Sequence, residues 1–150
     1  MILIPDTLHA QLLANGAAAQ ETDHWPVVKF FNPTGAATWL LTELAADGDT
    51  LFGLCDLGFG CPELGYVSLR EIAGIRVGFG LRIERDRHFK ARYPLSVYAE
   101  AAHRHSAITE ADQALRDAVA ALGQSAHRDP DRASHPSAAA APSSVPPRRS

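Results

Sequence analysis

One stretch in the middle of the chain constrains the fold more than any other. The twenty residues at 50–69 combine strand-forming apolar side chains with four of the chain's eleven glycines, both cysteines and two carboxylates. Aromatic and β-branched residues favour strands, whereas glycine allows the sharp bends that separate them. We therefore expect strands at 50–57 and 64–69, the second as a strand of the core, joined by a glycine-rich bend at 58–62.

The residues before this stretch predict a hairpin. Apolar runs at 37–44 and 50–57 flank Asp47-Gly48, a hairpin signal because glycine tolerates a positive φ angle. Successive side chains of a strand point to opposite faces of the sheet. In the first strand this alternation places Trp39, Leu41 and Glu43 on one face and Thr38, Leu40, Thr42 and Leu44 on the other.

Turn signals and periodicity predict the remaining elements. Strands are expected at 26–31 and, beyond two further glycines, at 81–89, where polar and apolar residues alternate. Asn15-Gly16 suggests a left-handed end to the first helix, and residues 109–112 resemble a capping box that opens the last one. Strands with hairpin connections and no internal repeat indicate an α+β fold, with a mainly antiparallel sheet of four to five strands and flanking helices. The helices are predicted at 4–16, 70–75, 94–105 and 109–123.

The composition changes at Gln124. From there to the end the chain has no Leu, Ile, Phe, Tyr or Trp, and it holds half of the ten prolines. Such a segment buries too little apolar surface to offset the entropy cost of ordering it. We therefore predict one α+β domain over residues 1–123 and a disordered tail, rich in Ala, Pro, Ser and Arg, over residues 124–150.

Charge and cysteine content narrow the functional classes. The net charge is −3, and the tail has four arginines against two aspartates, so the rest of the chain carries −5. An acidic body argues against a grip on nucleic-acid phosphates. Cys55 and Cys61 cannot form a four-ligand zinc site alone, and no run approaches the roughly 18 apolar residues of a membrane span. We expect a cytoplasmic protein with free thiols, no signal peptide, no membrane partner, no cofactor and no metal.

Four motifs follow one another along the chain: Thr38-Trp-Leu-Leu-Thr-Glu-Leu, Asp47-Gly-Asp-Thr-Leu-Phe-Gly-Leu-Cys-Asp-Leu-Gly, Pro62-Glu-Leu-Gly-Tyr-Val-Ser-Leu and Ile83-Glu-Arg-Asp. Together they resemble a family of small bacterial proteins known as domain of unknown function 2958, over residues 4–102. The resemblance implies an accessory protein of plasmids or other mobile genetic elements, and it carries no activity or catalytic residues. The chain departs from the family pattern at Cys61, where an apolar residue is expected, and beyond Ile108.

The strand predicted at 81–89 carries the sharpest catalytic candidates. Glu84, Asp86 and His88 would point the same way, about 6.5–7 Å apart in succession, and such groups can hold a divalent metal or transfer protons. A metal there would support a metal-assisted hydrolase by activating its bound water. Three ligands on a straight strand nevertheless span about 13–14 Å, too far for one ion unless a bulge bends the strand. We favour a solvated strand face and expect neither metal nor turnover.

The bend at 58–62 is a second candidate site. Asp56 and Glu63 flank it, but the sequence matches neither a phosphate loop nor a dinucleotide fingerprint. The favoured interpretation is that the glycines allow a tight bend and the carboxylates accept backbone hydrogen bonds. Trp39 and Tyr66 are candidate binding anchors, with core packing as the favoured role for both. No motif supports a serine or cysteine nucleophile.

Three functional hypotheses remain. The leading one is a cytoplasmic accessory protein of a mobile genetic element that binds a protein partner without catalysis. The first alternative is the metal-assisted hydrolase that would use Glu84, Asp86 and His88. The second is a nucleic-acid-binding protein that would use a basic cluster: Arg82, Arg85, Arg87, Lys90 and Arg92.

Overall fold

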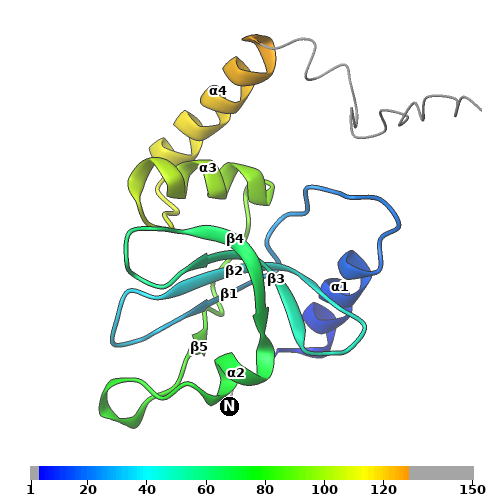
Figure 1. Cartoon of the computed structure of the whole chain (residues 1–150), viewed down its shortest axis with the longest axis vertical. Helices are drawn as coiled ribbons and strands as arrows, with labels where there is room; N and C mark the ends of the chain where they lie inside the picture. The colour runs from blue at the N-terminus through cyan, green and yellow to red at the C-terminus, as the bar shows by residue number, and fades with distance from the viewer. Residues whose placement is uncertain (1–3, 129–150) are drawn as a thin grey trace, which may run out of the picture.

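Five strands form one antiparallel sheet in the computed structural model of the chain, which describes residues 4–128 (Figure 1). The spatial order is β4-β3-β2-β1-β5, so β4 and β5 are the edge strands. This arrangement, with helices on both faces, confirms the predicted α+β fold and its antiparallel sheet. The strands are β1 (Val28–Phe31), β2 (Thr38–Leu44), β3 (Thr50–Asp56), β4 (Glu63–Ser68) and β5 (Glu84–Arg85).

The helices cover the two faces of the sheet separately. Leu12 of one helix and Ile72 of another lie in the first core cluster, with side chains from β1, β2 and β3. Two further helices pack Tyr98 and Leu115 on the opposite face, against Leu40 and Leu54. No helix among residues 4–128 has the length and apolar content that a membrane span requires. The helices are α1 (Asp6–Gly16), α2 (Leu69–Gly74), α3 (Leu95–His105) and α4 (Asp112–Arg128), with a short 3-10 turn, η1 (Gly78–Gly80).

Helix α1 packs directly on the backbone of β2. The Asn15 side-chain amide donates a hydrogen bond to the Thr42 carbonyl at 2.9 Å. A Cβ atom at Gly16 would lie only 2.2 Å from the carbonyl oxygen of Leu44. The predicted left-handed helix end is wrong, because Ala17 follows with φ −89°. Gly16 is therefore required for close approach to the strand rather than for a turn.

A β-bulge in β2 changes which side chains share a face. The register with β3 shifts between Leu41 and Glu43, so Leu44 packs in the same core cluster as Leu41. Glu43 is paired with Phe52, whose ring packs against the opposite cluster. The predicted assignments of Glu43 and Leu44 are therefore wrong. The strict alternation used for that prediction fails because a bulge inserts one unpaired residue, here between Leu41 and Glu43.

The strand predicted at 81–89 is much shorter than expected. Only Glu84 and Arg85 pair with β1, and the chain then turns away from the sheet. The turn is built by Asp86, whose carboxylate accepts a hydrogen bond from the backbone N–H of His88 at 2.9 Å. An aspartate that bonds the backbone two residues on favours a turn over a ladder. The prediction of a long strand here is wrong for this reason.

Helix α4 differs from its prediction at both ends. The Thr109 hydroxyl accepts from the N–H of Ala111 at 3.2 Å, so it does not form the predicted capping box, and the helix begins at Asp112. The helix runs to Arg128, beyond the predicted end at Gly123. The disordered tail predicted from residue 124 lies, from 129 onward, outside the described residues. The domain boundary at 123 stays a prediction.

Candidate binding surface

Two loops present a phenylalanine between two glycines. Gly58-Phe59-Gly60 lies in the loop between β3 and β4, and Gly78-Phe79-Gly80 forms η1. The two phenylalanine residues are 84% and 98% exposed, respectively. Three of the four glycines have positive φ angles, which glycine adopts without strain because it has no side chain. Each loop therefore turns sharply around an aromatic side chain that contacts little of its own fold.

Both loops lie at the same end of the sheet, beside the turn between β1 and β2 (Figure 1). The backbone N–H of Gly78 donates to the Thr34 hydroxyl at 3.0 Å. A Cβ atom at Gly58 would lie 3.1 Å from the Cβ of Ala36. The β1–β2 turn therefore lies next to both phenylalanine loops. We call the exposed apolar side chains of this end, Leu57, Phe59, Ile75 and Phe79, the loop-end surface.

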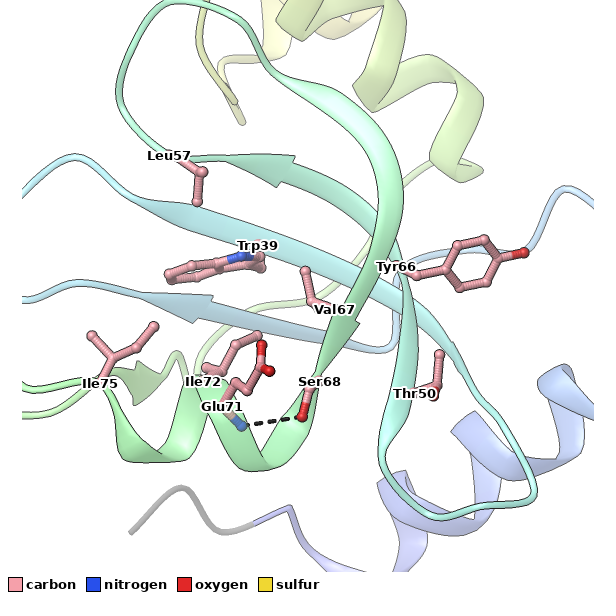
Figure 2. A pocket seen from close by; sticks show the side chains of 9 residues that line it. All are labelled: Trp39, Thr50, Leu57, Tyr66, Val67, Ser68, Glu71, Ile72 and Ile75. Atoms are coloured by element: carbon pink, nitrogen blue, oxygen red, sulfur yellow. Dashed lines mark hydrogen bonds between the residues drawn. The ribbon is translucent and has the colours of Figure 1, made fainter.

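A pocket of about 500 Å³ opens beside the loop-end surface, between β4 and α2. Trp39 is buried at its base, and Leu57 and Ile75 belong to both the pocket and the loop-end surface. Figure 2 shows the side chains of Trp39, Val67 and Ile72 gathered around the pocket. The residues that line the pocket are Trp39, Thr50, Leu57, Tyr66, Val67, Ser68, Glu71, Ile72 and Ile75.

The two predicted aromatic anchors have different environments. Trp39 is 3% exposed and packs in the first core cluster, as the sequence analysis favoured. Tyr66 is 74% exposed, so its predicted core role is wrong. Its ring points away from the pocket in Figure 2 and lies 5.0 Å, between centroids, from the ring of Phe52. Tyr66 is exposed because β4 is an edge strand and not, as predicted, a core strand.

Asp56 holds the β3–β4 loop against the rest of the fold. One carboxylate oxygen accepts from the N–H of Gly58 at 2.9 Å, and the other accepts from the N–H of Ile108 at 3.0 Å. Asp56 itself is only 3% exposed, and both hydrogen bonds are partly buried. The favoured interpretation of Asp56 as a backbone acceptor is confirmed. Glu63, at the other end of the bend, is exposed.

Asp49 anchors the wall of the pocket that α2 forms. Its carboxylate accepts from the Ser68 hydroxyl at 2.7 Å and from the N–H of Arg70 at 2.8 Å. The Ser68 hydroxyl in turn accepts from the N–H of Glu71, which is the side-chain cap of α2 (Figure 2). A capping residue of this kind satisfies N–H groups that the helix cannot satisfy itself. The β2–β3 hairpin therefore fixes where α2 begins.

Two carboxylates of the β2–β3 hairpin, Asp47 and Asp49, should make the protein less stable in acid. Hydrogen bonds from Thr50, chiefly from its hydroxyl, lower the pKa of Asp47 to about 2, and the Ser68 hydroxyl lowers the pKa of Asp49. A folded-state pKa below the unfolded value favours the folded state once the carboxyl is ionised. This contribution is present above the unfolded pKa and is lost as the pH falls toward about 2. Thermal denaturation should show this fall, and Asp47→Asn should show a smaller one. An equal fall in both proteins would contradict the assignment.

The three predicted catalytic residues do not share a strand face. Glu84 pairs with Phe31 in β5, whereas Asp86 lies in the turn that follows, 3.5 Å from the Nζ atom of Lys29. His88 lies in the same turn, and its backbone N–H, rather than its imidazole, is bonded to the Asp86 carboxylate. Within the described part of the chain, no three His, Cys, Asp or Glu residues are grouped so that they could hold a metal ion.

The predicted basic cluster is engaged with several separate elements. Arg92 forms an ion pair with Asp112 and donates to the Glu110 carbonyl at 2.6 Å. Arg82 donates to the Ala73 carbonyl at 3.2 Å, on the side of α2. These two guanidinium groups therefore bond to different elements, whereas Arg85 and Arg87 line one pocket together with Lys29.

The two cysteines are free thiols, as expected. Burial raises the pKa of Cys55 to about 11, so its thiol stays protonated at neutral pH. The thiolate is the nucleophilic form of cysteine, and this environment disfavours it. Cys61 is exposed at the end of the glycine-rich bend.

Sequence analysis missed the residues that define the loop-end surface. The sequence pattern places Phe59 in a bend and Phe79 in a break before a strand. The signal that could have found them is the repeated Gly-Phe-Gly motif, at 58–60 and 78–80. An aromatic residue between glycines, outside any regular element, has no neighbours in its own segment to cover it.

Comparison with known proteins identifies one family. A family model described as "Protein of unknown function (DUF2958)" matches residues 3–109. The match covers the sheet, α1 to α3 and both phenylalanine loops, and it ends before α4. Comparisons with curated proteins and with solved structures give no match.

Proposed function

The chain belongs to this family of proteins of unknown function (DUF2958), and we propose that it acts by binding another protein through the loop-end surface, without catalysis. The observation that carries the proposal is the exposure of Phe59 and Phe79 at one end of the sheet. The family resemblance supports an accessory role in a mobile genetic element. We propose that the protein acts in the cytoplasm.

Phe59 and Phe79 lack, in the free protein, the burial that stabilises an aromatic side chain. A phenylalanine that becomes buried removes roughly 150–250 Å² from water, and about 25 cal/mol is gained per Å² of apolar surface. Phe59 and Phe79 realise almost none of this gain within their own fold, since they are 84% and 98% exposed.

The backbone of Phe79 strengthens the argument. Its φ of 61° and ψ of 23° lie in the left-handed region, which costs a residue with a Cβ roughly 1–2 kcal/mol. Neither burial nor backbone preference therefore explains a phenylalanine at this position. A role in contacting another molecule accounts for its presence.

The polar groups nearby support binding over chemistry. Asp56 is committed to two backbone N–H groups, and the Cys55 thiol is held in its protonated form. Asp86 is committed to a turn and to Lys29. The exposed side chains that define the loop-end surface are apolar, which suits a protein surface as their ligand.

Removing both loop aromatics should strongly reduce partner capture. We expect the tagged Phe59→Ser/Phe79→Asn double variant to retain at least about tenfold less of the partner, because buried aromatic anchors dominate interface energies. Asparagine is chosen because it tolerates the left-handed backbone. The measurement is quantitative mass spectrometry of proteins retained from lysates of cells that carry the gene.

The matched control is Val119→Ser, which removes an exposed apolar side chain on α4, away from the loop end. This variant should capture the same protein as the unmodified chain. A gel-shift assay with single- and double-stranded DNA at moderate salt addresses the nucleic-acid alternative. The proposed function would be rejected if the double variant captured as much partner as the unmodified chain. It would also be rejected if the protein bound DNA tightly and in a salt-sensitive way.

A further inference from the structure

The outer edge of β4 is open for pairing. β4 is the first strand in the sheet order, and among residues 4–128 only β3 is hydrogen-bonded to it. An unpaired edge presents a row of backbone N–H and C=O groups that can template another strand. Its side chains are also exposed, with Leu64 at 51% and Tyr66 at 74%.

The register identifies the backbone groups that face outward. The N–H of Leu69 bonds to the carbonyl of Asp49, which continues the antiparallel ladder between β3 and β4. Hydrogen-bonded and non-hydrogen-bonded pairs alternate in such a ladder. Leu69 and Asp49 form a hydrogen-bonded pair. Leu64 and Tyr66 each lie an odd number of residues before Leu69, so they belong to non-hydrogen-bonded pairs. Their N–H and C=O groups therefore point away from β3, toward the open edge.

We infer that the protein partner contributes an extended peptide segment that adds a sixth strand beside β4, places an apolar side chain in the adjacent pocket and brings a basic residue to Glu71. This inference rests on the proposed function and specifies how the partner is recognised. A row of backbone donors and acceptors selects an extended peptide, since main-chain hydrogen bonds give affinity and side-chain pockets give specificity.

The pocket accepts a side chain because β4 leaves room for one. A Cβ atom at Gly65 would have no heavy atom within 4 Å, so the centre of the strand is open there. Strand alternation puts Gly65 on the same face as Val67, which lines the pocket. The pocket volume of about 500 Å³ lies within the range of sites that bind small ligands and side chains.

Glu71 indicates which charge the bound peptide should carry. Its exposed carboxylate lines the pocket, and no ion pair in the described chain involves it (Figure 2). Glu63, at the start of β4, likewise has no ion-pair partner in that region. A peptide along β4 thus passes between two uncompensated negative charges. Electrostatic complementarity favours a lysine or arginine in the segment that binds.

The test begins with selection from a displayed library of random linear peptides on the full-length protein. The peptides selected should alternate apolar with other residues and carry a lysine or arginine. A synthetic copy of such a peptide should protect the amide hydrogens of Leu64 and Tyr66 from hydrogen exchange in the unmodified protein. A selection that enriches no peptide, or binding without this protection, overturns the inference.

Two pairs of proteins test backbone pairing and charge separately. Tyr66→Pro removes an outward N–H and the ring, whereas Tyr66→Ser removes only the ring, so proline should weaken peptide binding at least about tenfold more. Glu71→Lys should reverse the preference, binding a copy of the peptide in which glutamate replaces the basic residue better than the original. Equal effects of proline and serine, or an unchanged charge preference, contradict the inference.

Two further outcomes separate this inference from the proposed function. Partner capture that depends on Phe59 and Phe79 but leaves the Leu64 and Tyr66 amides unprotected keeps the proposed function and rejects strand addition. Protection of the same amides without peptide, in a dimer seen by analytical ultracentrifugation, assigns the edge to a second copy of the chain and rejects the peptide. The exchange measurement needs no variant, so it remains decisive even where Tyr66→Pro fails to fold.

Discussion

Gly53→Ala is expected to lower the free energy of unfolding by about 3 kcal/mol, because overpacking against rigid groups costs this much. A Cβ atom at this position would lie 2.1 Å from the carbonyl oxygen of Leu40 and 2.8 Å from the Cα of Leu41. Both contacts are backbone atoms of β2, next to the bulge, and neither can rotate away as a side chain would. Urea denaturation followed by circular dichroism measures the change.

The matched control is Gly65→Ala, in the residue directly opposite Gly53 in the β3–β4 register. A Cβ atom there has no heavy atom within 4 Å. Glycine is also a poor strand former, so the control should change stability by no more than about 0.5 kcal/mol, or stabilise the fold slightly. Equal losses in the two variants would mean that the close approach of β3 to the bulge in β2 is not what constrains Gly53.

Asp56→Ala is expected to cost about 3 kcal/mol. The substitution removes the hydrogen bonds that the N–H groups of Gly58 and Ile108 donate to a carboxylate, and a hydrogen bond to a charged group contributes roughly 1.5–3 kcal/mol. Because the carboxylate joins the β3–β4 loop to the segment before α4, both regions should loosen together. Urea denaturation measures the total loss, and faster hydrogen exchange at the Gly58 and Ile108 amides locates it.

Glu63→Ala is the control for this second prediction. Glu63 is exposed and lies in no ion pair within the described chain, so its removal should change stability by less than about 0.5 kcal/mol. If Asp56→Ala were as stable as Glu63→Ala, the aspartate would not be the support of the loop that carries Phe59. The burial of the Asp56 carboxylate would then need a different explanation, such as a catalytic role.

The sequence predicted the elements whose signals are local. The hairpin of β2 and β3 was predicted from Asp47-Gly48, and Gly48 does have a positive φ of 73°. Helix α3 was predicted at 94–105, and it spans Leu95–His105 with Leu95, Tyr98 and Ala102 buried. These features depend on a turn residue or on helical periodicity, both of which are contained within one segment.

What the sequence could not predict depends on pairing between distant segments. Tyr66 looked like a core residue because β4 has the composition of a buried strand, but the order of the strands places it at an edge. The bulge that moves Leu44 to the other face arises from the pairing of β2 with β3. The pocket beside Trp39 likewise needs α2 to be anchored by Asp49, a contact between residues about twenty positions apart in the chain.

The candidate site was hidden for a related reason. Phe59 and Phe79 lie twenty positions apart, and the fold brings their loops next to the same β1–β2 turn. The sequence shows a phenylalanine between glycines in each loop, but it does not show that the phenylalanine side chain is exposed. The three residues of the hydrolase hypothesis show the opposite case, since a good local pattern failed when the Asp86 turn ended the strand.

The central claim is that the loop-end surface binds a protein partner. Its most direct test is the dissociation constant of the purified partner, measured by titration calorimetry for the unmodified chain, Phe59→Ser/Phe79→Asn and Val119→Ser at equal folded concentrations. The account predicts at least about tenfold weaker binding for the double variant and no change for Val119→Ser. Equal dissociation constants for all three proteins would contradict it.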